Sequence, residues 1–364
     1  FYKIVYFCFM EQQFISTLSI IASELKSGSV SAKSPSNIAL VKYWGKKKNQ
    51  IPTNSSISYT LTNSYTETEL RFSPKTSDTF EVDVYLEGEL KESFAPKIIT
   101  FFERITAYIS FLKHYKFEVH THNSFPHSSG IASSASGMSA LALCLVQIEN
   151  LLGANLSEEN ALKKASFLAR LGSGSACRSV YKGLVEWGEN DFIEGSSDLF
   201  GTKYPDAEIH DVFKTFHDTI LLIHEGQKSV SSTVGHNLMN GHPYAERRFV
   251  EANENLEKLL AILKAGDVKA FGELVEHEAL TLHAMMMMSN PAFILMKPNT
   301  VAALEKLWEF RRETGNHLYF TLDAGANVHL LYPEQDAEAI EIFIKNELKQ
   351  FCQNGNYIKD KVSF

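Results

Sequence analysis

The sequence has little cysteine and no long apolar run, and each shortage excludes a class of protein. Only four cysteines occur in 364 residues, and no two of them are close neighbours. Neither a disulfide framework nor a zinc site with the usual cysteine spacing is therefore predicted, and we expect a cytoplasmic location. No apolar stretch approaches the roughly 18 residues that a membrane span needs, so we expect no membrane partner.

The chain also lacks an excess of positive charge. Its formal net charge is −8, and no long Lys/Arg tract offsets this value. Binding to nucleic acid normally requires a basic face, so we expect no nucleic-acid partner. A few cations gathered in a pocket can still bind a small anion, which leaves an anionic substrate open.

Hydrophobic periodicity divides the chain into a short leader and two larger parts. We expect a weakly ordered leader over residues 1–30, then parts at 31–205 and 206–364 that meet in a loop-rich stretch. The pattern predicts strands up to about residue 90 and at 117–121, 183–187, 219–224, 318–322 and 328–332. It predicts helices at about 95–113, 137–152, 158–171, 244–264, 267–288, 298–314 and 334–351. Strands and helices that mix without strict alternation indicate an α+β fold.

A loop rich in serine and glycine, residues 125–137, follows a predicted strand and opens a predicted helix. Small residues let the backbone approach a ligand closely, and the N–H groups of a helix N-terminus favour an anion. The loop lacks the Gly-Lys-Ser/Thr ending of a Walker A motif. It is therefore either a different kind of phosphate loop or a plain flexible connection.

An apolar strand that starts near Ser34 ends in the string Lys-Tyr-Trp-Gly-Lys, residues 42–46. Two lysines four positions apart and flanked by aromatic side chains suit an anionic substrate in a partly dry wall. The alternative is a solvated strand end, especially because Lys47 and Lys48 follow directly.

Two later segments carry the remaining candidate groups. Residues 172–179 form a second Gly/Ser-rich turn that includes Arg178. The planar fork of an arginine suits a carboxylate or a phosphate, although a surface arginine in a helix-to-strand connection is the alternative. Asp323 lies in a turn between two short apolar strands, where an aspartate ordinarily bonds its own backbone.

Taken together, these segments resemble the GHMP kinase superfamily and, within it, the mevalonate diphosphate decarboxylases. The resemblance covers nearly the whole chain from about Ser34 onward. Its most specific parts are residues 37–39, 42–46, 52–58, 130–137, 172–179, 230–233 and 323–325. The Lys-Tyr-Trp-Gly-Lys and Gly-Ser-Gly-Ser-Ala-Cys-Arg strings distinguish decarboxylases from the kinases of the superfamily. Ala326 departs from the family's usual proline, and the arginine expected for the substrate phosphates has only Arg71 as a guess.

The resemblance implies a two-lobed GHMP kinase-like fold with the active site in the cleft between the lobes. It implies ATP-dependent decarboxylation of mevalonate 5-diphosphate to isopentenyl diphosphate, with ATP and Mg²⁺ as cofactors and a homodimer as the assembly. Asp323 would orient or deprotonate the C3 hydroxyl, with Lys42 beside it, and Arg178 would hold the substrate carboxylate. Ser134 would contact the ATP phosphates and magnesium, and no side-chain cluster is expected to hold the metal alone.

The resemblance also implies two sets of binding residues. The substrate set is Tyr43, Trp44, Gly45, Lys46, Ser173, Gly174, Ser175, Ala176, Cys177 and Thr233. The ATP set is Gly130, Ala132, Ser133, Ser134, Ala135, Ser136 and Gly137. Three alternatives stay open: a decarboxylase of mevalonate 5-phosphate, a mevalonate 3-kinase-like relative that stops at phosphorylation, and a non-catalytic small-molecule binder.

Overall fold

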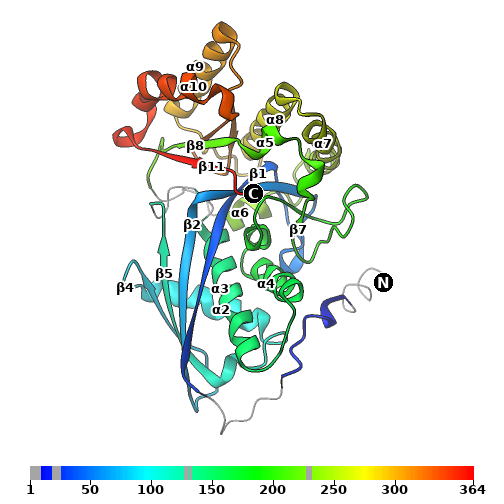
Figure 1. Cartoon of the computed structure of the whole chain (residues 1–364), viewed down its shortest axis with the longest axis vertical. Helices are drawn as coiled ribbons and strands as arrows, with labels where there is room; N and C mark the ends of the chain where they lie inside the picture. The colour runs from blue at the N-terminus through cyan, green and yellow to red at the C-terminus, as the bar shows by residue number, and fades with distance from the viewer. Residues whose placement is uncertain (1–9, 19–25, 127–130, 132, 227–231) are drawn as a thin grey trace.

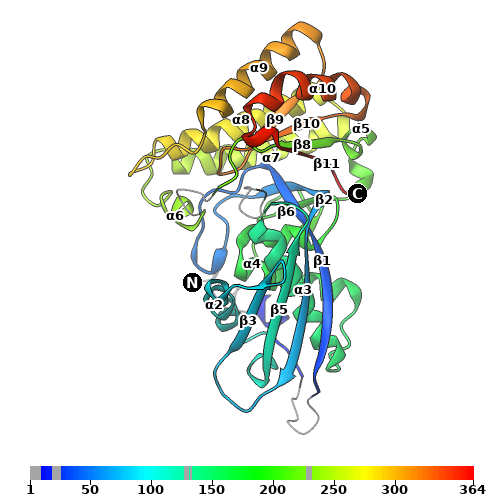
Figure 2. The same cartoon turned by 90° about the vertical axis from the view of Figure 1, so that its left-hand side faces the viewer.

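The computed structural model describes residues 10–18, 26–126, 131, 133–226 and 232–364. Within these residues the chain forms a seven-stranded sheet and a four-stranded sheet, each covered by helices. Figures 1 and 2 show the larger sheet and its helices in the lower half of the molecule, and the smaller sheet and its helices above. None of the described helices is long and apolar enough to cross a membrane.

The larger sheet has the strand order β4-β3-β5-β2-β6-β7, with β1 paired to β2 outside this path. Its strands are β1 (Gly28–Val41), β2 (Ser56–Pro74), β3 (Glu81–Leu86), β4 (Glu89–Leu90), β5 (Tyr115–Asn123), β6 (Leu184–Trp187) and β7 (Thr202–Lys203). In β5, Tyr115, Phe117 and Val119 are buried, while the residues between them are partly exposed. This alternation places one face of the sheet against the core and the other toward solvent.

Three helices cover the apolar face of the larger sheet: α2 (Ala95–Ile105), α3 (Ser133–Leu151) and α4 (Glu158–Gly172). Helix α3 carries a single ionisable side chain of the Asp/Glu/Lys/Arg type, Glu149, so it can lie in the interior. The buried Glu149 carboxylate accepts a hydrogen bond from Lys164 of α4 at 2.6 Å. This internal pairing is what allows two charges to be buried at the contact between the helices.

The smaller sheet is antiparallel, with the order β11-β8-β10-β9. Its strands are β8 (His217–Leu221), β9 (Tyr319–Leu322), β10 (Val328–Tyr332) and β11 (Tyr357–Lys361). Helices α7 (Ala245–Ala265) and α8 (Val268–Met287) pack on one face, and α9 (Pro298–Thr314) and α10 (Ala337–Phe343) pack on the other. Two short helices, α5 (Asp211–Lys214) and α6 (Ser232–Asn237), lie in the connections.

A buried carboxylate joins the two sheets. Asp360 of β11 accepts the backbone N–H groups of Thr62, Asn63 and Ser64 in β2, at 3.1, 2.7 and 2.6 Å. Ordered acceptors of this kind satisfy backbone donors that the sheet itself leaves open. The junction brings the end of β1 close to β9, and the Thr321 hydroxyl donates to the Ala39 carbonyl at 3.4 Å.

Most elements follow the sequence predictions, with differences at their ends. The helix predicted at about 95–113 ends earlier, as α2, at Ile105. Turns and a short 3-10 segment follow it up to His114. The predicted final helix starts as α10 and continues to Phe351 in π and 3-10 geometry. Strand β11 and helix α6 were not predicted, because neither is long enough to show a clear hydrophobic period.

Within the predicted leader, residues 1–30, Phe14 packs against the rest of the chain. This ring is 3% exposed and stacks on Phe167 of α4, with 4.1 Å between the ring centroids. The Tyr108 hydroxyl donates to Glu11 at 2.9 Å, and the Ser16 N–H donates to the Tyr108 carbonyl at 3.1 Å. The residues around Phe14 therefore pack on the helices of the larger sheet.

We predict that Phe14→Ala lowers the free energy of unfolding by about 3–5 kcal/mol, because it leaves a cavity beside Phe167. Ile15 is the matched control, since its side chain is 47% exposed. Ile15→Ala should cost less than about 1 kcal/mol. Denaturant unfolding of both variants checks this, and equal stability of Phe14→Ala and the parent protein would show that the contact contributes nothing.

Candidate active site

Lys42 and Asp323 meet where the two sheets join. Lys42 follows directly after β1, and Asp323 lies in the turn between β9 and β10. The Lys42 Nζ is 3.4 Å from Asp323 Oδ1, and the two side chains are 2% and 31% exposed. Burial lowers the pKa of the Lys42 ammonium, and the neighbouring Asp323 carboxylate partly offsets this effect. The pair thus places a poorly hydrated cation beside a carboxylate that a ligand can reach.

The turn that carries Asp323 is held from several sides. The Gly325 N–H donates to the Asp323 carbonyl at 2.7 Å, and the Asn327 side chain accepts the His224 N–H at 2.9 Å. The Thr300 hydroxyl of α9 donates to the Ala326 carbonyl at 2.7 Å. These bonds restrain the turn although alanine stands where the resemblance led us to expect proline.

Arg178 is buried next to this pair. It lies in the 3-10 segment Gly174–Val180, between α4 and β6, and is 2% exposed. Its Nη1 donates to the Ser56 hydroxyl, and its Nε donates to Asn37 Oδ1 at 3.4 Å. Burial lowers the pKa of Arg178, whereas Asp323 acts in the opposite direction, so the two charges interact. Arg178 also lowers the pKa of Lys42, which puts both cations within electrostatic reach of one ligand.

The aromatic segment after Lys42 packs on a histidine that the sequence analysis did not single out. The Tyr43 and Trp44 ring centroids lie 4.3 and 4.6 Å from that of His236 in α6. The Gly45 N–H donates to His236 Nδ1 at 2.9 Å, and Gly45 has a φ of 100°, which favours glycine. Burial lowers the pKa of His236 to about 3, so the ring is neutral at pH 7 and its Nδ1 can accept.

The Tyr43 hydroxyl is a buried polar group in this part of the site. Among the described residues it finds no hydrogen-bond partner although the oxygen is buried. Gly174 closes the other side, since a Cβ there would come within 3.1 Å of the Tyr43 hydroxyl and 2.8 Å of the Trp187 ring. A buried polar atom without a partner is costly in a protein interior, so it is available to a bound ligand.

The second Gly/Ser segment, residues 172–179, lies beside the Ser/Gly loop at residues 125–137. Ser173 Oγ is 3.4 Å from Ser134 Oγ, and the Ser175 carbonyl accepts a bond from Asn37 at 3.3 Å. Ala176 and Cys177 are fully buried. Burial raises the pKa of the Cys177 thiol to about 12, so Cys177 fills space and is not a nucleophile at neutral pH.

Lys46 is half-buried, and its pKa is lowered by burial and then by Arg104 of α2. The Arg104 Nη1 donates to the Leu171 carbonyl at 3.0 Å, which places this arginine next to the Gly172 end of α4. Arg71, the sequence guess for the phosphate-binding arginine, was wrong. It lies at the far end of β2 from Ser56, is 50% exposed and pairs with Glu69 at 2.9 Å.

Some side chains of the Ser/Gly loop, residues 125–137, lie in the core and others lie at the surface. Ser133 is partly exposed and Ser134 is exposed, whereas Ala135 and Ser136 are buried at the start of α3. The Ser136 hydroxyl lies 2.7 Å from that of Thr66, so it anchors the helix start to β2. A Cβ on Gly137 would meet open space, which leaves the backbone accessible. Gly130 and Ala132 lie outside the described residues, as does the side chain of Thr233.

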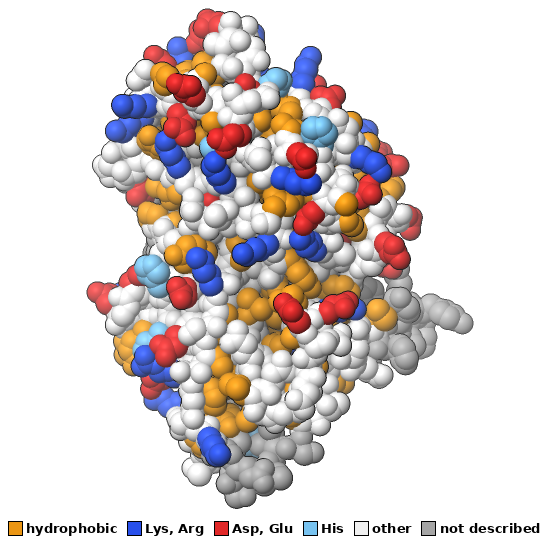
Figure 3. All heavy atoms as spheres, viewed as in Figure 1, with side chains coloured by type: hydrophobic (Ala, Val, Ile, Leu, Met, Phe, Trp, Pro, Cys, Tyr) orange, Lys and Arg blue, Asp and Glu red, His pale blue; other side chains and the backbone are white. Residues whose placement is uncertain are grey.

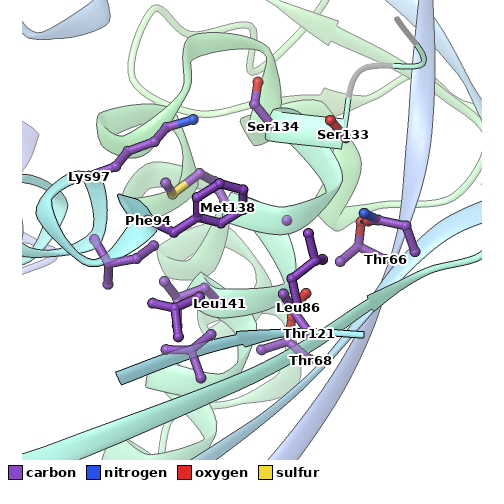
Figure 4. A pocket seen from close by; sticks show the side chains of 15 residues that line it. Thr66, Thr68, Leu86, Phe94, Lys97, Thr121, Ser133, Ser134, Met138 and Leu141 are labelled. Atoms are coloured by element: carbon purple, nitrogen blue, oxygen red, sulfur yellow. Dashed lines mark hydrogen bonds between the residues drawn. The ribbon is translucent and has the colours of Figure 1, made fainter. Parts of the chain in front are cut away.

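A pocket of about 290 Å³ opens beside this loop (Figure 4). Its walls come from the larger sheet, α2 and α3. Lys97 and Ser134 lie at the same end of it in Figure 4, with Leu141 and Thr68 at the other. Partial desolvation by the pocket wall lowers the pKa of Lys97. The lining residues are Thr66, Thr68, Val84, Leu86, Phe94, Lys97, Ile98, Val119, Thr121, Asn123, Ser133, Ser134, Gly137, Met138 and Leu141.

No group of three or more His, Cys, Asp or Glu side chains that could hold a metal occurs in the described part of the chain. On the face in Figure 3, cationic and anionic side chains are interspersed without a large basic patch. The cations of the candidate site are Lys42, Lys46 and Arg178, and Lys97 lies beside the Ser/Gly loop.

Two family models match the chain. Residues 34–198 match the diphosphomevalonate decarboxylase-like N-terminal domain, and residues 219–363 match the mevalonate 5-diphosphate decarboxylase C-terminal domain. A diphosphomevalonate decarboxylase from Gibberella zeae is 28% identical over 333 residues, which cover 87% of this chain and 84% of the relative.

Solved structures agree with this result. The mevalonate diphosphate decarboxylase from Staphylococcus aureus is 29% identical, with a TM-score of 0.79, and the match covers 94% of this chain and 97% of that one. The protein named MDDEF, in a structure of its complex with MVAPP, AMPPCP and magnesium, is 30% identical to this chain. The TM-score is 0.78, and the match covers 93% of this chain and 97% of that one.

Proposed function

The chain belongs to the family of diphosphomevalonate decarboxylases, and from this premise we propose that Lys42, Asp323 and Arg178 carry out its ATP-dependent decarboxylation. The substrate is mevalonate 5-diphosphate, and the products are isopentenyl diphosphate, ADP, phosphate and carbon dioxide. The observation that carries the proposal is the 3.4 Å contact between Lys42 and Asp323, with the buried Arg178 guanidinium beside it.

In the first step the C3 hydroxyl of the substrate attacks the γ-phosphorus of ATP, and the bond to the ADP oxygen breaks. Asp323 accepts or orients the hydroxyl proton, which a partly exposed carboxylate can do. Lys42 keeps that carboxylate ionised and stabilises charge on the transferring group from a poorly hydrated position. Mg²⁺ bound with ATP would supply neutralisation of the phosphate charge.

In the second step the C3–O bond breaks and the 3-phosphate leaves with its electron pair. The electrons of the bond between C1 and C2 then form the new C2–C3 double bond, and the carboxylate leaves as carbon dioxide. Arg178 holds the carboxylate before it leaves. Its position on Ser56 and Asn37 fixes the plane of the guanidinium, which suits a planar carboxylate.

The pocket beside the Ser/Gly loop suits the nucleotide base and sugar, because it is largely apolar and ends at the start of α3. Ser133 and Ser134, with the N-terminus of α3 and the Lys97 ammonium nearby, supply donors for the ATP phosphates. The Ser134–Ser173 distance of 3.4 Å supports placing these phosphates next to the substrate segment.

The diphosphate end of the substrate is assigned to Lys46, Ser173, Ser175 and Thr233, and Arg104 adds a second cation near Lys46. Tyr43, Trp44, Gly45 and residues 174–177 complete the wall. We also retain as proposals the cytoplasmic location, which suits the free buried cysteines, and the homodimer.

We predict that mevalonate 5-diphosphate exceeds the 5-monophosphate by at least about tenfold in kcat/KM, because each lost charge-assisted contact costs about 1.5–3 kcal/mol. Lys46→Gln should reduce this preference by about the same factor. Lys47→Gln is the matched control, since Lys47 is exposed next to it in the sequence. Steady-state assays with both substrates check this, and equal use of the monophosphate by the parent enzyme would overturn the choice of substrate.

A further inference from the structure

Helix α8 contacts the backbone of both members of the Lys42–Asp323 pair. Its Glu278 carboxylate accepts the Lys42 N–H at 2.9 Å. The same carboxylate accepts two bonds from Arg248 of α7, at 3.1 and 2.5 Å, and one from Asn255 at 2.6 Å. Glu278 is fully buried. Four donors on one buried carboxylate leave it little freedom to move, so the Lys42 backbone is fixed to α7 and α8.

The second contact comes five residues later on the same helix. His283 Nε2 lies 3.1 Å from the Asp323 carbonyl oxygen. A carbonyl can only accept, so Nε2 carries the proton and donates. His283 is 2% exposed, and burial lowers its pKa to about 4, so the ring is neutral at pH 7. The Asp323 turn is therefore tied to α8 by a neutral donor.

These two contacts have a common geometric effect. Lys42 follows a strand of the larger sheet, and Asp323 follows a strand of the smaller one. Positions 278 and 283 on a regular helix are separated along its axis by about 7.5 Å, a spacing that a helix holds rigidly. The helix thus acts as a spacer between two backbone segments that come from different sheets.

We propose that α8 sets the separation of Lys42 and Asp323, with Glu278 and His283 as the positioning residues. The inference rests on the proposed function, in which this pair acts on the C3 hydroxyl and the transferring phosphoryl group. Neither residue touches the substrate in this proposal. Because a misplacement of about 1 Å can cost roughly 100-fold in rate, loss of either contact should act mainly on kcat.

The first test compares two replacements of His283. Glutamine can place an N–H donor close to the position of His Nε2, whereas leucine fills similar space without a donor. We expect His283→Leu to lower kcat by about 10- to 100-fold, with KM for mevalonate 5-diphosphate and ATP changed less than about threefold. His283→Gln should retain kcat within about threefold, although both variants lower Tm. Equal kcat values for the two variants would overturn the positioning role.

The second test uses two buried glutamates of the same helix. Glu276 also bonds an arginine, Arg311, at 2.7 Å, and its carboxylate accepts from Arg311 and Trp308 rather than from Lys42, so it serves as the matched control. We expect Glu278→Gln to lower kcat at least about tenfold and Glu276→Gln to leave it within about twofold, while both reduce Tm. A kcat for Glu278→Gln that equals that of Glu276→Gln would contradict the proposal.

The pH profile of kcat for Glu278→Gln separates a specific effect on Lys42 from a general loss of stability. The charged groups that act on Lys42 are Asp323, Glu278 and Arg178, and Glu278 raises the pKa of Lys42. Removing its charge should therefore move the alkaline limb of the kcat profile to lower pH. An unmoved limb in a folded variant would count against the role of Glu278. If Glu278→Gln does not fold, the His283 pair decides the matter alone.

Parallel measurement of Asp323→Asn keeps this inference apart from the proposed function. If Asp323→Asn is inactive while His283→Leu behaves as the parent enzyme, the pair is catalytic and α8 does not position it. If Asp323→Asn turns over normally, the proposed function itself fails, whatever the His283 variants do.

Discussion

Asp323→Asn is expected to cut turnover by about 10²–10⁴-fold, the usual contribution of a general base, while the fold and ATP binding persist. Asparagine matches the size of aspartate but has no basic oxygen to take the C3 hydroxyl proton. It also removes the negative charge that offsets the desolvation of Lys42. The buried Lys42 ammonium loses this partner, so Tm should fall, while the 31% exposure of the Asp323 side chain limits the loss and the variant should still fold.

Single-turnover and steady-state assays, together with a nucleotide-binding titration, measure this effect. Asp211→Asn is a suitable control, because the Asp211 side chain is 92% exposed on α5 and outside the candidate site. Near-normal turnover by Asp323→Asn would reduce Asp323 to a turn residue that bonds its own backbone.

Arg178→Lys is expected to slow carbon dioxide release by about 10- to 100-fold, although it retains the positive charge. Lysine cannot bind Ser56 and Asn37 while presenting a planar fork to a carboxylate. Each lost charge-assisted bond costs about 1.5–3 kcal/mol, which corresponds to roughly one to two powers of ten. We expect phosphoryl transfer to suffer less, so that ADP forms in excess over carbon dioxide.

Arg170→Lys is the matched control for this prediction. Arg170 is also fully buried and donates to the Leu199 carbonyl at 2.7 Å, but it belongs to α4 rather than to the site. It should lose stability without uncoupling ADP formation from carbon dioxide release. A parent-like rate for Arg178→Lys would show that the guanidinium plane is not used.

The parts of the fold that local pattern determines were predictable from the sequence. Helices α7, α8 and α9 were predicted within one residue of their observed ends, because each repeats its apolar residues at helical spacing over at least four turns. The strand–turn–strand around Asp323 was predicted for the corresponding reason in strands. Phe14 was missed, because a single apolar residue in a weakly patterned stretch does not show that another element will cover it.

The candidate site was predictable only in its central residues. Lys42, Arg178 and Asp323 lie in distinctive strings, and the structure brings them together. His236, Glu278 and His283 lie on helices, where a lone polar residue has no local signal of its role. Glu278 acts on Lys42 across 236 positions in the chain, and only the packing of α8 against β1 reveals the contact. Arg104 was missed for the same reason, since its neighbour Lys46 belongs to a distant segment.

The central claim is that ATP consumption drives loss of carbon dioxide at the Lys42–Asp323 site. Counting ADP, inorganic phosphate and carbon dioxide in one reaction with mevalonate 5-diphosphate, ATP and Mg²⁺ tests it most directly. We predict one phosphate and one carbon dioxide for each ADP, with isopentenyl diphosphate as the organic product. ADP formed without carbon dioxide would contradict the claim and make this chain a kinase.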